Sequence, residues 1–567
     1  METSKKQLNS KLNCLLNSRA NVKQTMHQIT HFFTTTLFKP VDNFLNYFTM
    51  YKVILGGLSL IAGLSLILAL FGLLPFTFAP AIISLLTFIL GNFGLNFVLG
   101  KLLDAPINLE SAAITGLILY LIFSPPTTAQ GFLMTLTAII VAMTSKYVFA
   151  IHKKHLFNPA AIAALIVMVI GFEGVSWWVA TPVLFPALAI VALLVVRKIR
   201  RFSLFGAFAL AALASILYHN LASISSGITT LPELFAQVLL SWPLLFFGSI
   251  MLTEPYTMPP TKRLQLVFGV LVGLLFGARF HIGPFFATPE FALIVGNIFA
   301  YIVSPKQKLF LTVKAKRKLS ESIYEFAFTR PASQLGIPPF SFKAGQYLEW
   351  TIPMETAGLL PDSRGNRRFF TIASSPTEKE ILLGVKIPEE NPSYFKKALV
   401  NLKKDDCVVG GQLAGDFTLQ LSKKSNQSEL VFIAGGIGVT PFRSMTKYLI
   451  DMAESKQLPA DILPKVTLLY CGSTPDDLVY QDVFTEASKK IKFNPVYVLT
   501  RPESKPKNWQ GETGRLTPEI ITKHIAKPTQ ATFYLSGPNA MVHAYKKLLV
   551  DMQVPTTNIK EDYFPGF

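Results

Sequence analysis

Ten stretches of mostly apolar residues fill roughly the first 300 positions and constrain the fold more than any other feature. A helix needs about 20 apolar residues to cross a bilayer core of roughly 30 Å, and shorter stretches can act as half-helices where other protein covers them. The predicted spans are residues 52–73, 79–100, 110–124, 129–149, 159–172, 176–196, 203–219, 233–252, 263–280 and 289–304. We therefore expect a polytopic α-helical membrane domain.

The composition supports a membrane protein of several domains. Half of the 567 residues are hydrophobic and only 15% are charged, which does not fit a single soluble domain. The net charge of +19 is spread between the apolar stretches and the C-terminal half, so it does not indicate nucleic-acid binding. Cys14, Cys407 and Cys471 are too far apart for an iron–sulfur cluster or a zinc site, so we expect organic redox cofactors and no metal.

The distribution of basic residues predicts the orientation. Lys and Arg accumulate in alternate loops, for example Lys153 and Lys154, then Arg200 and Arg201, and such loops face the cytoplasm. Residues 1–50 lack the order of a signal peptide and are expected to form a cytoplasmic arm. Ten crossings over residues 51–304 bring the chain back to the cytoplasm. The sequence thus predicts a multi-pass protein of a prokaryotic inner membrane with both termini cytoplasmic.

An internal repeat relates the two halves of the apolar region. Residues 116–127 and 248–261 both end in Pro-Pro-Thr, and Asn158-Pro159 and Thr288-Pro289 both open a span with a capping residue and a proline. A five-plus-five inverted repeat places binding sites near short or broken helices. The alternative is that Pro-Pro merely ends a helix twice by chance. Glu110 and Glu254 are then either part of an ion pathway or headgroup-region residues.

From residue 308 the pattern changes to short strands and turns, and the first part, residues 308–422, carries flavin-site features. In Arg367-Arg368-Phe369-Phe370-Thr371, strand alternation sends Arg368 and Phe370 to one side, where a guanidinium holds a phosphate and a ring packs on an isoalloxazine. Ser393 opens a helix whose N-terminus suits a pyrophosphate. The predicted FAD-binding residues of this antiparallel barrel-like domain are Gly345, Gln346, Tyr347, Arg368, Phe370, Thr371, Ser374 and Ser393.

Residues 428–567 carry the features of an α/β nucleotide-binding domain. The strand Leu430–Ala434 runs into a glycine turn and a helix, a sequence that lets a backbone approach a pyrophosphate. Asp476 and Asp477, after the next strand, favour NADH over NADPH because carboxylates repel a 2′-phosphate, although Arg501 and Lys505 could reverse this preference. The predicted nicotinamide-nucleotide residues are Gly436, Gly438, Thr440, Pro441, Ser473, Gly537, Pro538 and Met541.

The apolar half resembles a known family of electron-transfer proteins. Residues 108–126, Phe157-Asn158-Pro159-Ala160-Ala161 and Leu252-Thr253-Glu254-Pro255 look like motifs of a flavin-carrying membrane subunit of the sodium-translocating NADH:quinone reductase and of its counterpart in the Rnf complex. The resemblance implies FMN or riboflavin in the membrane domain and coupling to ion transport. Those subunits often carry FMN on a threonine, for which the nearest match is Ser226-Gly227-Ile228-Thr229-Thr230, although Ser223 and Ile228 depart from the pattern. Thr229 and Thr230 are therefore candidate attachment sites, with an ordinary loop as the alternative.

The C-terminal half is similar to the ferredoxin–NADP reductase superfamily over residues 308–567. This resemblance implies FAD and NAD(P)H, with Thr371, Ser536 and Asp562 as catalytic residues and with Phe564 and Phe567 covering the site. Ser536 stands where the superfamily usually has cysteine. Taken together, the two halves predict hydride transfer from NAD(P)H to FAD and electron transfer into or across the bilayer. The acceptor would be a quinone or another electron-transfer protein.

Three other interpretations stay open. A haem-bearing ferric reductase would need facing histidines, whereas His152, His155, His219 and His281 lie at predicted span ends, so we expect no haem. An ion or solute transporter with a regulatory reductase domain would move solute without its flavin. A reductase that is merely anchored in the membrane would serve a cytoplasmic acceptor and would work without its apolar half.

Overall fold

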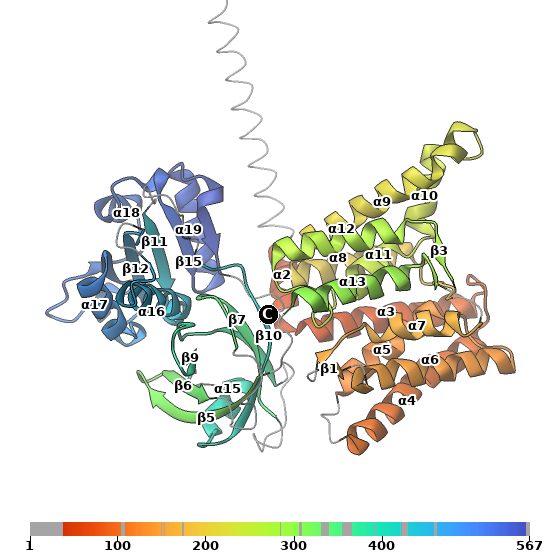
Figure 1. Ribbon diagram of the computed structural model, residues 1–567, viewed down its shortest axis with the longest axis horizontal. Helices are drawn as coiled ribbons and strands as arrows, with labels where there is room; N and C mark the ends of the chain where they lie inside the picture. Colours follow the sequence, from red (N-terminus) through yellow and green to blue (C-terminus); the bar gives the residue numbers. More distant parts are fainter. Residues whose placement is uncertain are drawn as a thin grey trace, which may run out of the picture.

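The computed structural model describes most of the chain in two bodies, a helical domain and a reductase (Figure 1). The residues described are 38–103, 108–148, 150–151, 154–172, 175–283, 285–304, 309–329, 340–353, 366–390, 392–419, 421, 429–458 and 462–562. Phe564 and Phe567 lie outside them.

The helical domain consists of packed helices with two short β-hairpins between them. The helices are α2 (Phe38–Tyr47), α3 (Met50–Leu70), α4 (Phe78–Leu102), α5 (Leu109–Ile122), α6 (Ala129–Val148), α7 (Pro159–Val169), α8 (Phe185–Ile199), α9 (Phe202–Ser225), α10 (Leu231–Leu240), α11 (Leu244–Phe246) with the π-helical turn η2 (Phe247–Met251), α12 (Lys262–Phe276) and α13 (Pro289–Val303). The hairpins are β1 (Ala150–Ile151) with β2 (Lys154–His155), and β3 (His281–Ile282) with β4 (Phe285–Phe286). One continuous apolar core runs through these helices.

Ten full-length spans, as predicted, are not supported. Among the described residues, four helices (α3, α4, α6 and α9) are long and apolar enough to cross a bilayer, and the bent pair α10 and α11–η2, with a 55° break, could make a fifth. The others are shorter because they begin or end at proline or at irregular backbone. The predicted span 176–196 becomes helical only at Phe185, since Trp177 has a positive φ of 47° and the segment before it is not helical.

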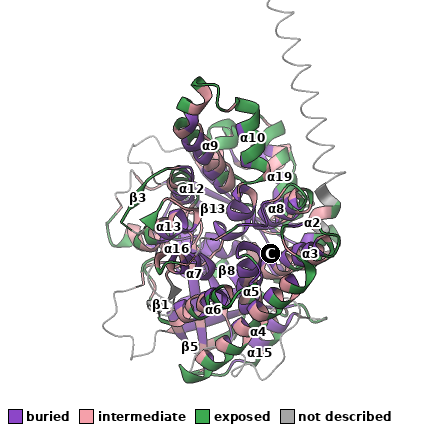
Figure 2. Cartoon of the chain, turned by 90° about the vertical axis from the view of Figure 1, so that its right-hand side faces the viewer, coloured by how far each residue is buried: buried purple, intermediate pink, exposed green. Residues whose placement is uncertain are grey.

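The outer surface of the helical domain is unusually apolar. Large hydrophobic side chains lie exposed on its long helices, for example Leu70 at 66% on α3, Leu90 at 63% on α4 and Leu210 at 71% on α9. Exposed residues follow the outer faces of α4, α9 and α10, whereas the inner faces are buried (Figure 2). Contiguous exposed apolar surface of this kind is typical of contact with lipid or with another protein.

The reductase contains two six-stranded sheets. The first is antiparallel and curled, with the order β8-β7-β10-β5-β6-β9, and the second is parallel, with the order β14-β13-β12-β11-β15-β16. The first comprises β5 (Leu309–Lys318), β6 (Ile323–Thr329), β7 (Tyr347–Thr351), β8 (Arg367–Thr371), β9 (Ile381–Lys386) and β10 (Cys407–Ala414), with helix α15 (Tyr394–Asn401) beside it. The second comprises β11 (Leu430–Gly435), β12 (Val466–Gly472), β13 (Phe493–Leu499), β14 (Glu512–Thr513), β15 (Thr532–Ser536) and β16 (Ile559–Glu561), with helices α16 (Thr440–Glu454), α17 (Gln481–Lys490), α18 (Pro518–His524) and α19 (Asn539–Asp551).

Sheet topology explains where the nucleotide site must lie. In the parallel sheet, β11 pairs with β12 on one side and with β15 on the other, so the direction of winding changes between β11 and β15. Ligands of open α/β sheets bind at such a switch point, beyond the carboxyl ends of the strands. The glycine turn after β11 and Ser536-Gly537 after β15 both end there, as register pairs Ala434 with Ser536. The predicted α/β nucleotide-binding domain is therefore confirmed.

Candidate flavin and nicotinamide site

Strand β8 brings the predicted phosphate-binding and ring-packing residues together. Arg368 and Phe370 both face Phe395 of α15, with the Phe370 and Phe395 ring centroids 5.6 Å apart and the Arg368 guanidinium 5.9 Å from the Phe395 ring. Arg368 is buried, with 7% of its surface exposed. A buried guanidinium is held in place for a charged partner, because its desolvation is costly otherwise.

The N-terminus of α15 completes an anion-binding cradle beside Arg368. Ser393 is the N-cap residue, is buried and makes no side-chain capping bond, so its hydroxyl and the first amides of the eight-residue helix are available. Helix N-termini favour negative charge through their free N–H groups and the helix dipole. The combination fits the pyrophosphate of a dinucleotide such as FAD.

Three of the other predicted flavin residues shape the scaffold. Gly345 adopts a φ of +95°, and a Cβ there would lie 2.1 Å from the Phe417 carbonyl oxygen. The Gln346 amide donates to the Gly415 carbonyl at 3.3 Å, and the Ser374 hydroxyl accepts from the Leu382 amide at 3.1 Å. These contacts hold the curled sheet closed next to the α/β domain.

Tyr347 and Thr371 lie on the opposite face of the sheet from Arg368 and Phe370. Tyr347 pairs with Thr371 across the two strands and packs edge-on against Phe369, with ring centroids 5.6 Å apart. Paired residues of antiparallel strands share a face. Grouping Tyr347 with Arg368 and Phe370 on one face is thus wrong, because alternation separates them.

The two glycine turns of the nicotinamide site touch each other. A Cβ on Gly438 would lie 2.5 Å from the Cα of Gly537, and a Cβ on Gly435 would lie 2.4 Å from the Met541 sulfur. The Ser536 hydroxyl donates to the Asp562 carboxylate at 3.0 Å, so the two residues predicted to be catalytic are in direct contact. Pro441 starts helix α16 directly behind this turn, and the Thr440 hydroxyl bonds back to the Ile437 carbonyl at 3.2 Å.

The loop after β12 differs from the sequence-based expectation. The Asp477 carboxylate turns inward, accepting hydrogen bonds from the Ser473 amide at 2.9 Å and from Lys386 at 2.5 Å. Burial by itself would raise the pKa of Asp477, but Lys386 and the Ser473 and Thr474 amides lower it overall. Asp477 therefore fixes the loop and joins the two reductase domains. Only exposed Asp476 is left to repel a 2′-phosphate.

Contacts between the two bodies are features that the sequence analysis missed. Tyr256, in the loop between η2 and α12, donates to the Glu349 carboxylate at 3.0 Å and accepts a hydrogen bond from Arg367 of β8. Burial raises the pKa of the Tyr256 hydroxyl, so it stays a donor. The Lys262 amide at the start of α12 donates to the Asp416 carboxylate at 2.9 Å. The Pro-rich loop signalled a special turn but not its partner.

The polar residues predicted in the helical domain lie at two places. Glu254 accepts hydrogen bonds from the Asn158 side chain at 2.9 Å and from the Thr257 hydroxyl at 3.1 Å, close to the reductase-facing loop. Glu110 is exposed in the first turn of α5. Thr229 and Thr230 lie at the tip between α9 and α10, far from the reductase (Figure 1). Thr230 is engaged in a capping box with Glu233.

Histidines and other metal-ligating residues do not gather in the part of the chain that the structure describes. No group of three or more His, Cys, Asp or Glu side chains there could hold a metal ion. His219 contacts the Ser215 carbonyl of its own helix at 2.8 Å.

Comparison with known proteins identifies the C-terminal half. The family described as "Oxidoreductase NAD-binding domain" matches residues 432–547. NADH-cytochrome b5 reductase 1 of Aspergillus clavatus is 30% identical over 254 residues, which cover 43% of this chain and 75% of that protein. One of the subunits of the Na(+)-translocating NADH-quinone reductase of Neisseria meningitidis is 28% identical over 210 residues, covering 35% of this chain and 49% of that protein.

A solved structure shares this region as well. The cytochrome b5 reductase domain of Ulva prolifera nitrate reductase has 19% identity and a TM-score of 0.37, and the match covers 46% of this chain and 98% of that one. The chain is thus an NAD(P)H-dependent flavin oxidoreductase in its C-terminal half. By these matches, the chain belongs through this half to the NADH-cytochrome b5 reductase family of ferredoxin–NADP reductase-like proteins.

Proposed function

We propose that the protein is a membrane flavoprotein that takes hydride from NADH onto FAD on the cytoplasmic side and passes the electrons into or across the membrane. FAD, when bound, supplies a centre that accepts hydride and releases single electrons. The helical domain would contribute the conducting part of the path. Residues 1–50, 51–304, 308–422 and 428–567 would form the arm, the membrane domain, the FAD domain and the NAD(P) domain.

The observation that carries this proposal is the docking of the reductase onto the helical domain through the strand that holds the flavin. One face of β8 presents Arg368 and Phe370 to the FAD cradle, and the other presents Arg367 to Tyr256 of the helical domain. A reductase serving only soluble acceptors has no need to bury this strand against apolar helices. The arrangement favours electron transfer into the helical domain over simple anchoring.

Within the reductase, the described contacts support a role for each residue. Arg368 and Ser393 would bind the FAD pyrophosphate, and Thr371 would hydrogen-bond near the reactive flavin nitrogen. Close packing of Gly438 against Gly537 would let the nicotinamide ring approach. The Ser536 hydroxyl, held by Asp562, would orient the nicotinamide. The other predicted residues, including Phe564 and Phe567, would line or cover this site.

The helical domain supports a five-plus-five inverted repeat. In each half, a hairpin precedes a helix that begins with a capping residue and proline: β1–β2 before α7, and β3–β4 before α13. The two hairpins lie at opposite ends of the helical domain (Figure 1). Opposite placement is what an inverted repeat requires. With its apolar exterior, this repeat favours a multi-pass domain in a prokaryotic inner membrane, with half-helices among the ten segments.

Electron transfer across the full bilayer would need a redox group within the helical domain. A core of roughly 30 Å is too wide for one tunnelling step, so we propose FMN or riboflavin there, with Thr229 as the better attachment site because Thr230 caps α10. Glu254 and Glu110 would belong to a coupled ion pathway. The final acceptor would be a quinone or an electron-transfer protein.

Flavin content and electron delivery test the proposal. Purified full-length protein should contain more than one flavin per chain and the fragment 308–567 only one. In inverted vesicles, NADH should reduce an acceptor that the fragment cannot serve. A single flavin in the full chain, with equal acceptor reduction by the fragment, would leave only an anchored reductase. Solute flux that persists after flavin removal, without NADH-driven reduction, would instead favour the transporter.

A further inference from the structure

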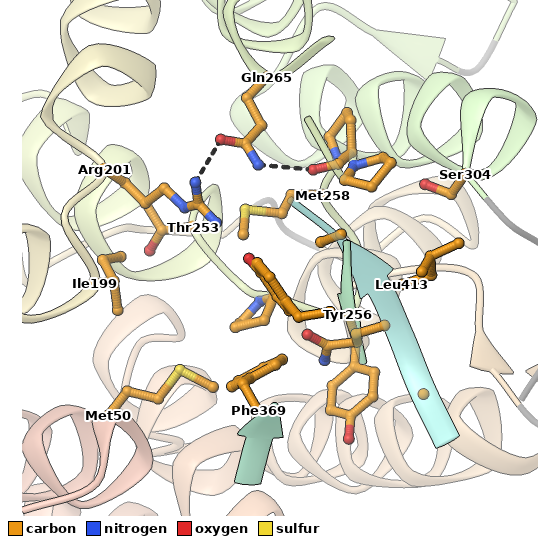
Figure 3. A pocket seen from close by; sticks show the side chains of 17 residues that line it. Met50, Ile199, Arg201, Thr253, Tyr256, Met258, Gln265, Ser304, Phe369 and Leu413 are labelled. Atoms are coloured by element: carbon orange, nitrogen blue, oxygen red, sulfur yellow. Dashed lines mark hydrogen bonds between the residues drawn. The ribbon is translucent and has the colours of Figure 1, made fainter. Parts of the chain in front are cut away.

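A small cavity lies where the two bodies meet. It has a volume of about 60 Å³, and residues of the helical domain and of strands β7, β8 and β10 line it. In Figure 3, Tyr256 projects between Met50 and Phe369 on one side and Arg201 and Gln265 on the other. No residue predicted from the sequence as a site residue lines this cavity except Tyr347.

The walls combine apolar surface with hydrogen-bond donors. Met50, Met258 and Phe369 supply thioether and aromatic surface, which suits the faces of a flat ring. Ser304 Oγ and Gln412 Nε2 also line the cavity, and both are buried atoms that find no hydrogen-bond partner within the described part of the chain. Buried polar groups are nearly always satisfied, so two such donors in one cavity indicate a bound acceptor.

The size of the cavity limits its occupant. A water molecule needs roughly 10–15 Å³ measured in this way, so the space corresponds to about four to six waters. One six-membered ring with its substituent oxygens fits such a space. The three fused rings of a flavin do not.

The cavity lies beside the expected reactive part of the flavin. Phe369, which lines the cavity, is two residues before Thr371 on the same face of β8, and strand residues rise about 3.4 Å each, so the two are about 7 Å apart. Thr371 is the residue that would contact the reactive flavin nitrogen. Met50 begins α3 and Ser304 directly follows α13, so the cavity also lies at the ends of membrane helices.

We infer that this cavity binds the ring of a quinone whose apolar tail lies in the lipid, with Ser304 and Gln412 donating to its carbonyl oxygens. The inference rests on the proposed function and names its acceptor site. The overall step is balanced as NADH + H⁺ + quinone → NAD⁺ + hydroquinone. NADH loses two electrons, and the ring gains two electrons and two protons, one from the hydride and one from solvent.

Equilibrium binding to the full-length, FAD-loaded protein in detergent tests the site without turnover. The probes are decylubiquinone and menadione, titrated by calorimetry in the absence of NADH. Met258→Trp, which fills the cavity, should abolish binding, whereas Met258→Leu should retain it. Ser304→Ala and Gln412→Asn should each weaken binding by about five- to tenfold, the loss expected for one hydrogen bond. Asparagine suits the positive φ of 40° at Gln412.

Ser84→Ala is the matched control. Ser84 is also a buried serine whose hydroxyl has no partner among the described residues, but it lies on α4 away from the cavity, so its loss should leave quinone binding unchanged. FAD content and the thermal melt check that each variant folds.

Three results would overturn the inference. Neither quinone binds the wild-type protein, both bind Met258→Trp as tightly as wild type, or Met258→Trp loses a second flavin instead of quinone affinity. The proposed function fails separately, when the full chain holds one flavin and NADH reduces no acceptor that the fragment 308–567 cannot serve.

Discussion

At the scale of single residues, the nicotinamide site depends on glycines whose roles differ. Gly438 has no room for a side chain because the Gly537 backbone lies against it. Gly436 has open space but a φ of +51°, a conformation that most side chains disfavour. The same motif therefore uses one glycine for close approach and another for backbone geometry.

Gly438→Ala should impair nicotinamide binding and destabilise the protein by about 1–3 kcal/mol, because two backbones must separate. Stopped-flow reduction of FAD by NADH and urea unfolding measure the two effects. Gly436→Asn should be nearly neutral in both assays, since asparagine tolerates positive φ. Equal losses in the two variants would contradict this division of roles.

Asp477 links stability to pH. Its pKa is lowered in the folded protein, so its contribution is present above the unfolded pKa of about 3.9 and is lost as pH falls through the folded value. Asp477→Asn should therefore cost about 1–2 kcal/mol at pH 7, and the difference from wild type should vanish below about pH 4. Flavin-fluorescence melts between pH 3 and 8 measure it. Asp476→Asn, at an exposed site, should show no such trend.

At the scale of elements, the short helix α5 is possible because another segment satisfies its end. The Trp178 indole donates to the carbonyls of Tyr120 at 3.0 Å and Phe123 at 2.9 Å. The Trp177 and Val179 amides donate to Ile122 and Leu121 at 3.0 and 3.2 Å. Irregular backbone among apolar helices is tolerated only with such partners. The predicted span 176–196 lost its first turns to this role.

Trp178→Phe should destabilise the helical domain by about 1–3 kcal/mol, because two buried carbonyls lose a donor while the ring is kept. Near-ultraviolet circular dichroism during thermal unfolding in detergent reports it. Trp242→Phe, at the half-buried break before α11, is the comparison and should cost much less. A larger effect at Trp242 would show that ring packing, rather than the cap, dominates.

At the scale of the whole molecule, two bodies are held together by a few buried polar contacts. Tyr256 bridges Glu349 and Arg367, and the Arg367 guanidinium lies 5.7 Å from the Tyr256 ring centroid. Glu349 is only 3% exposed, so removing its donor leaves a poorly solvated carboxylate. The contact fixes the flavin-binding strand against the helices.

Tyr256→Phe should loosen this docking without disabling the reductase. We expect ferricyanide reduction by NADH to stay near the wild-type rate and delivery of electrons to a membrane acceptor to fall about tenfold or more. Proteolysis near residues 305–308 should become faster. Tyr218→Phe, at a site 71% exposed on α9, should change none of these. Parallel loss of both activities in Tyr256→Phe would mean that the tyrosine supports the reductase fold itself.

Local sequence patterns predicted much of the fold and of the flavin cradle. Apolar stretches, caps and prolines located helices in the first half, and period-two alternation correctly put Arg368 and Phe370 on one side of β8. The glycine turn after β11 was predictable because it follows from strand, turn and helix order within one short segment. These features depend on neighbours along the chain.

The sequence alone determined the two modules, their order and the reductase family, since local periodicity and motif spacing encode them. Tertiary structure decided the rest: that Trp178 caps α5, that Lys386 holds Asp477, and that Tyr256 docks on Arg367. These pairs lie 58, 91 and 111 residues apart in the sequence. Contacts over such separations arise from packing of whole elements, and no local pattern specifies which side chains then meet.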